Sequence, residues 1–65
     1  MTVENLNQTL YENVESNDVE STLTLIIHGA DPNYSEKTFS VVDHAKLYQQ
    51  TKQVKILLAN GGKID

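Results

Sequence analysis

Apolar residues recur at helical spacing in four short segments of the chain, residues 3–16, 19–28, 41–48 and 52–59. Only about two residues separate the segments within each half of the chain, and connections this short favour antiparallel neighbours. The pattern therefore predicts an all-α fold of four short helices in two antiparallel pairs, forming a single small domain over residues 1–65. The residues expected to face inward are Val3, Leu6, Leu10 and Val14; Val19, Leu23, Leu25, Ile26 and Ile27; Val41, Val42, Ala45 and Tyr48; and Val54, Leu57 and Leu58.

Polar residues before two of these segments are typical helix N-caps. Asn17 precedes the second segment, and Glu20 follows three residues later, as in a capping box. Ser40 precedes the third segment and is followed by Asp43 at the same spacing. We therefore expect Asn17 and Ser40 to begin these two helices.

Glycines end the second and fourth segments. Gly29 follows the second, and Asn60-Gly61-Gly62 follows the fourth, and glycine readily takes the left-handed conformation that closes a helix. Between the two pairs lies Asp31-Pro32-Asn33, which favours a turn or extended backbone over helix.

The two pairs are also similar in sequence to each other. Residues 10–31 align with residues 42–63 at a constant offset of 32 and without a gap, so that Gly29 meets Gly61. Self-similarity of this kind indicates a repeated structural unit. The expected units are repeat one, about residues 1–33, and repeat two, about residues 34–65.

The end of the first unit carries a resemblance to a known family. Residues 26–33 read Ile-Ile-His-Gly-Ala-Asp-Pro-Asn and closely resemble the end of an ankyrin repeat. Residues 17–20 resemble the turn into the second helix of that repeat, and residues 52–62 resemble that helix in the second unit. Residues 40–45 stand where ankyrin repeats usually carry Thr-Pro-Leu-His, a variable residue and Ala. The resemblance covers about residues 8–65.

The resemblance implies a helical fold with one hairpin-like loop between the units, and a non-enzymatic role in protein–protein interaction. It also implies that partners are contacted by the loop tip and by the exposed face of the first helix in each unit. An alternative is that the two aromatic residues of the loop only seal it against the helices. The protein-binding residues that we expect are Tyr11, Glu12, Glu15, Tyr34, Phe39, His44 and Leu47.

The charge is divided unevenly between the units. Residues 1–36 hold seven acidic residues and no Lys or Arg, whereas residues 37–65 hold five lysines and two acidic residues, giving charges of −7 and +3. Such asymmetry can guide docking. The chain has no arginine, and its few scattered lysines make a poor phosphate-binding stripe, so we expect no direct binding of nucleic acid.

The sequence gives little support to catalysis, a metal site or a cofactor. Without cysteine there is no disulfide and no thiolate ligand, and the spacing of His28 and His44 matches no established metal pattern. Ser40, Asp43 and His44 have the letters of a hydrolase triad, but a helix cap explains the first two better. We therefore expect no enzyme activity, no metal and no cofactor.

Two features bear on location. The N-terminal residues MTVENLNQTL lack the basic region and the apolar core of a signal peptide. No apolar run approaches the roughly 20 residues that cross a membrane. The expectation is a cytoplasmic protein that does not bind membranes.

Two repeats are fewer than the roughly three units that a repeat protein normally needs to cover its faces. We therefore expect a homodimer or an obligate complex with a partner protein. An alternative is a small acidic inhibitor, of phage or mobile-element type, that uses the first half to occupy the basic groove of a host nucleic-acid-processing enzyme. A third interpretation is a fragment of a longer repeat array.

Overall fold

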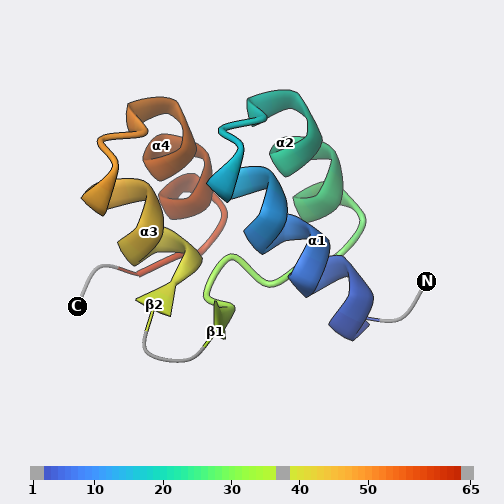
Figure 1. Ribbon diagram of the computed structural model, residues 1–65. Helices are drawn as coiled ribbons and strands as arrows, with labels where there is room; N and C mark the ends of the chain where they lie inside the picture. The colour runs from blue at the N-terminus through green and yellow to red at the C-terminus, as the bar shows by residue number, and fades with distance from the viewer. Residues whose placement is uncertain (1–2, 37–38, 64–65) are drawn as a thin grey trace.

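The computed structural model describes residues 3–36 and 39–63, without the side chains of Val3 and Glu4. The expected inward position of Val3 and the middle of the loop, residues 37–38, therefore lie outside the described part. The elements are α1 (Val3–Glu15), α2 (Val19–Ile27), β1 (Ser35–Glu36), β2 (Phe39–Ser40), α3 (Val41–Leu47) and α4 (Thr51–Ala59) (Figure 1).

The four predicted helices are confirmed, and each predicted end lies within one residue of the observed one. The all-α expectation is correct for most of the chain but incomplete. Two short strands, β1 and β2, form an antiparallel pair between the helix pairs, with Ser35 opposite Ser40 and Glu36 opposite Phe39. Their sequence lacked a period-2 run long enough to distinguish a two-residue strand from a loop.

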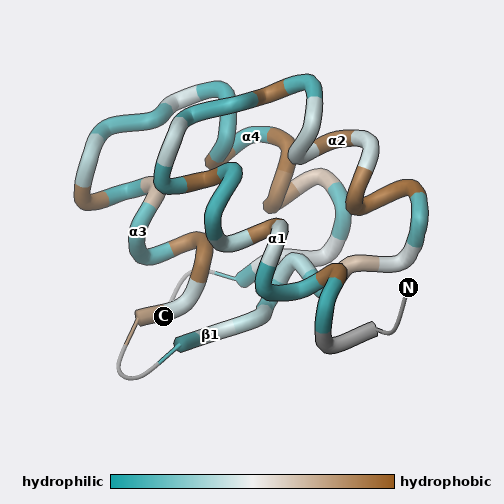
Figure 2. The backbone as a smooth tube through the Cα atoms, turned by 45° about the vertical axis from the view of Figure 1, so that its right-hand side comes forward, coloured by the Kyte–Doolittle hydropathy of each residue, from teal (hydrophilic) through white to brown (hydrophobic). Residues whose placement is uncertain are grey.

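The helices form two layers. α1 packs on α2 and α3 packs on α4, while α1 lies beside α3 and α2 lies beside α4 (Figure 1). Hydrophobic stretches occur along all four helices, and hydrophilic residues dominate the turns that join α1 to α2 and α3 to α4 (Figure 2). The β1–β2 pair leads directly into α3.

The turn between α1 and α2 recurs between α3 and α4. Asn17 and Gln49, which are 32 residues apart, both have left-handed backbones, with φ of 58° and 56°. The amide of the next residue in each turn closes it, because Asp18 N donates to Asn13 O and Gln50 N donates to Ala45 O, both at 2.8 Å. The two turns thus have the same backbone at equivalent positions.

The ends of α2 and α4 also match. Gly29 and Gly61 have φ of 107° and 101°, which confirms the expected glycine stops. The following amides reach back to the carbonyls five residues earlier, at 2.9 Å from Ala30 N to Leu25 O and 2.7 Å from Gly62 N to Leu57 O.

The N-caps agree with the prediction in one helix only. Ser40 and Asp43 form the expected capping box at the start of α3. At α2 the cap is Asp18 and not Asn17, since the Asp18 carboxylate accepts from Ser21 N at 3.2 Å and from Ser21 Oγ at 2.8 Å. Asn17 cannot serve because the turn holds it in the left-handed region, whereas an N-cap residue needs an extended backbone.

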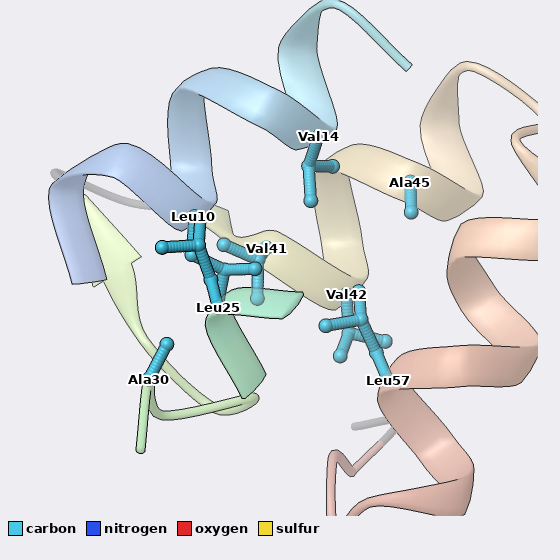
Figure 3. Close-up of a cluster of buried hydrophobic side chains, with 8 residues drawn as sticks. All are labelled: Leu10, Val14, Leu25, Ala30, Val41, Val42, Ala45 and Leu57. Atoms are coloured by element: carbon cyan, nitrogen blue, oxygen red, sulfur yellow. The ribbon is translucent and has the colours of Figure 1, made fainter. Parts of the chain in front are cut away.

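The core lies between the two layers and joins both pairs (Figure 3). Thr22 and Gln53 are also fully buried, which the sequence pattern did not predict. Thr22 satisfies its hydroxyl by donating to Asp18 O at 2.9 Å. The buried hydrophobic residues are Leu10, Val14, Leu25, Ala30, Val41, Val42, Ala45 and Leu57.

Four residues expected to face inward do not. Ile27 and Tyr48 are 74% and 63% exposed, and Leu23 and Leu58 are also exposed. Leu23, Ile27 and Leu58 are exposed because α2 and α4 are short outer helices covered along one side, so part of their wide apolar surface stays in solvent. Tyr48 is exposed at the C-terminal end of α3.

Two asparagines fasten the loops that follow α2 and α4. The Asn7 side-chain oxygen accepts from Asp31 N at 2.7 Å. The Asn33 oxygen accepts from Lys63 N at 2.9 Å, and its amide nitrogen donates to Gly61 O at 2.9 Å. Asn33 therefore ties the loop after the first pair to the end of the second.

Candidate protein-binding surface

Four aromatic side chains form a continuous row across the neighbouring helices α1 and α3. The ring centroids of Tyr34 and Tyr11 are 6.4 Å apart, and those of Tyr11 and His44 are 5.7 Å apart, both in edge-to-face arrangements. His44 and Tyr48 follow at 4.6 Å with tilted rings. We call these four residues the aromatic row.

Local structure explains how the row assembles. His44 and Tyr48 are four residues apart at the end of α3, so their side chains lie on the same side of that helix. Tyr11 comes from α1, which lies beside α3. Tyr34 precedes β1, and its carbonyl accepts from Val41 N at 2.8 Å, which holds it against the start of α3.

Carboxylates surround one end of the row. The Tyr34 hydroxyl donates to Glu36 Oε2 at 3.4 Å. Burial raises the pKa of Tyr11 above its ordinary value, and the negative charges of Glu15 and Glu36 raise it further. Two carboxylates therefore place negative charge beside Tyr11.

His44 is half-buried within the row. Its Nδ1 atom is buried and has no hydrogen-bond partner in the part of the chain that the structure describes. Its ring contacts Tyr11 on one neighbouring helix and Tyr48 on its own.

The structure brings together three of the expected binding residues, Tyr11, Tyr34 and His44. Glu15 lies close enough to affect Tyr11. Leu47 is 60% exposed, which agrees with the prediction that it faces away from the core. The remaining expected residues, Glu12 and Phe39, are exposed but are not members of the row.

Sequence reasoning missed Tyr48 and Glu36 as members of this surface. Tyr48 was assigned to the inner side of its helix on hydrophobic spacing alone. Its distance of four residues from His44 was the signal that could have placed both rings together. The position of Glu36 depends on the course of β1, which no local sequence signal predicts.

A second feature lies at the outer end of the second helix pair. A shallow groove of about 560 Å³ is lined by Ala45, Lys46, Gln49, Thr51, Val54 and Lys55. We call it the end groove. Both lysines are exposed, and the groove thus combines an apolar floor with positive charge.

Other kinds of site have no support among residues 3–36 and 39–63. No group of three or more His, Asp or Glu side chains in this part could hold a metal ion. None of its helices has the length and apolar character needed to cross a membrane.

Comparison with known proteins found no relative. No family model matches the chain, and neither a curated protein nor a solved structure matches it.

Proposed function

We propose that this chain is a protein-binding module of the ankyrin type, without enzyme activity. The observation that carries the proposal is the recurrence of one helix–turn–helix geometry at an offset of 32 residues. Equivalent turn residues, closing hydrogen bonds and terminal glycines support it. The short antiparallel β1–β2 pair between the units agrees with the hairpin-like loop that the resemblance implies.

The aromatic row supplies the binding surface in this proposal. Aromatic side chains are frequent anchors at interfaces because they bury a large area with little loss of conformational freedom. Tyr48 is largely exposed, and Tyr11, Tyr34 and His44 are half-buried. The other expected binding residues, which are all exposed, would extend the contact: Glu12, Glu15, Phe39 and Leu47.

The two ends of the module differ in a way that favours association through the second unit. Val14 of α1 faces Ala45 of α3 in the core (Figure 3). The residue 32 positions after Val14 is Lys46, which lines the end groove. A further unit stacked in the same manner would therefore cover this groove.

The outer end of the first unit is more polar. The residues 32 positions before Val41 and Ala45 are Thr9 and Asn13, so polar side chains stand where the second unit has core residues. Thr9 also satisfies its hydroxyl locally by donating to Asn5 O at 2.8 Å. This end resembles the polar cap of a repeat array, which leaves the end groove as the side for a partner or a second copy.

Affinity capture from an extract of the source organism tests the binding function. The whole chain serves as bait, beside a Tyr11→Leu variant that keeps an apolar side chain against the core but loses the aromatic ring. The proposal predicts a defined partner that the whole chain enriches and the variant does not. Equal recovery by both baits would contradict the role of the row.

Sedimentation velocity at micromolar concentration tests association through the end groove. The comparison pair is Lys46→Glu with Lys55→Glu against the unchanged chain. A dimer of the unchanged chain that dissociates in the double variant supports self-association through this end. A stable monomer with a high melting temperature contradicts obligate association.

The acidic-inhibitor alternative rests on the seven acidic residues and the absence of Lys and Arg within residues 1–36. It predicts that binding to a basic enzyme groove weakens steeply as ionic strength rises. Binding through the aromatic row with little salt dependence favours the interaction module instead.

A further inference from the structure

We propose that the aromatic row, together with Glu15 and Glu36, binds the guanidinium group of an arginine in a basic segment of the partner protein. This inference rests on the proposed binding function and specifies the chemistry of its ligand. It follows from the ring arrangement, from the position of the two carboxylates and from the distribution of charge.

The row leaves part of its ring surface accessible to a ligand, because three of its rings are half-buried and one is exposed. Tyr11 meets Tyr34 at 83° and His44 at 65°, so each contact sets the edge of one ring against the face of the other. Tyr48, at the end of the row, is 63% exposed. The face of an aromatic ring carries negative potential and attracts a cation within about 6 Å of its centroid.

The carboxylates strengthen this potential. Glu15 and Glu36 act on Tyr11 from α1 and β1, and Glu36 also accepts a hydrogen bond from Tyr34. Both glutamates belong to residues 1–36, a segment without Lys or Arg. A partner side chain with positive charge would therefore complete the electrostatics of this surface, and an acidic one would be repelled.

Arginine fits this combination better than lysine. A guanidinium is planar, stacks on aromatic faces and donates several hydrogen bonds in fixed directions to carboxylates. The compact ammonium of lysine is more strongly hydrated and cannot stack in the same way. A row of rings flanked by two carboxylates offers both kinds of contact to one arginine.

The end groove offers the opposite chemistry, because Lys46 and Lys55 flank it. A basic segment would be repelled there. The arginine is therefore assigned to the aromatic row, and the two surfaces of the module would select partners of different charge.

Three blocked Gly/Ser peptides with one central residue test the inference. The central residue is arginine, lysine or citrulline, which has the shape of arginine without its charge. Each is titrated into the isotope-labelled full chain, and the aromatic NMR signals of Tyr11, Tyr34, His44 and Tyr48 are followed. We expect saturable shifts with the arginine peptide, at least about tenfold weaker binding of the citrulline peptide, and intermediate binding of the lysine peptide.

Matched variants locate the site. Glu15→Gln and Glu36→Gln should each weaken binding of the arginine peptide several-fold, because each removes a charge beside the rings. Glu20→Gln removes the same charge from α2, where the residue is exposed, and should leave binding unchanged. All three substitutions keep the size of the side chain, which matches the variants for the comparison.

The outcomes separate this inference from the proposed function. Absence of shifts in the row with the arginine peptide, or equal binding of the citrulline peptide, overturns the inference. If the aromatic ring of Tyr11 is still required to capture a partner in that case, the binding function stands and only its ligand chemistry is wrong. If capture is independent of Tyr11 and the arginine peptide also fails, both are wrong.

Discussion

The first helix pair, α1 and α2, and the second, α3 and α4, reach the same backbone with different side chains. Asn17 and Gln49 take the same left-handed conformation in the two turns, and Leu25 and Leu57 are the buried leucines at equivalent positions. Between these fixed points the residues diverge. A small number of turn, glycine and leucine positions thus determines the backbone of the unit. The side chains at other positions can differ between the two units.

The loops after the two pairs show the same principle in their polar contacts. Asp31 N and Lys63 N are equivalent amides, and each donates to an asparagine side-chain oxygen. Asn7 serves the first from within its own unit, whereas Asn33 serves the second from the unit before it. The second unit therefore depends on the first for a contact that the first supplies for itself.

Truncation of the equivalent leucines should have the largest effect on the free energy of unfolding. Leu57→Ala should destabilise the fold by about 3–4 kcal/mol, because Leu57 is fully buried and its loss leaves a cavity. Leu25→Ala should cost about 1 kcal/mol less, because Leu25 is slightly exposed and its site can relax more easily. Urea unfolding monitored by circular dichroism gives both values, and equal losses would mean that the two sites pack alike.

Substitution of the two asparagines should destabilise different loops. Asn33→Ala removes two hydrogen bonds that join the units and should cost about 2 kcal/mol. Asn7→Ala removes one and should cost about 1 kcal/mol. Hydrogen exchange should also speed up at Lys63 in the first variant and at Asp31 in the second; the reverse pattern would contradict these assignments.

The buried glutamine offers a stabilising change. Gln53 is fully buried, and its Nε2 and Oε1 atoms have no hydrogen-bond partner within residues 3–36 and 39–63. Gln53→Leu should therefore raise the free energy of unfolding by about 1–2 kcal/mol, since a buried polar group without a partner is costly. Gln8→Leu, on the exposed surface of α1, is the control and should change it little. A loss of stability in Gln53→Leu would show that the amide has a structural role.

Glycine substitutions at the two left-handed turn residues should give the smallest difference in the free energy of unfolding. Gln49→Gly should stabilise the chain by about 0.5–1 kcal/mol, because a side chain with a Cβ is strained at φ of 56°. Asn17→Gly should change stability less, because asparagine tolerates this conformation. Thermal unfolding of the two variants side by side measures the difference, and an equal gain in both would contradict the explanation.

The helical spacing of the apolar residues was enough to place the helices, since each unit has only two helices and the turn between them is short. It was not enough to decide which apolar residues are buried. Ile27 and Leu23 continue the apolar stripe of α2, yet they are exposed because that short helix is covered on one side. Gln53 and Thr22 are buried because of their position and in spite of their polarity.

The candidate surface was predictable only in part for a related reason. Tyr11 and His44 followed from the repeat and the family resemblance, because they occupy the first helix of each unit. Tyr34 was expected in the loop, but its contact with Tyr11 was not predicted. The pairing of Tyr11 with Tyr34 and with His44 depends on how α1 sits beside α3 and on how the chain enters β1, and neither is encoded in local spacing.

The most direct test of the aromatic row as a recognition surface uses its most exposed member. Tyr48 is 63% exposed, so Tyr48→Ala should shift the melting temperature by only a few degrees. The measurement is the affinity of this variant for the captured partner, relative to the unchanged chain. Our account predicts a loss of about tenfold or more with the fold intact. Unchanged affinity in a folded variant would contradict it.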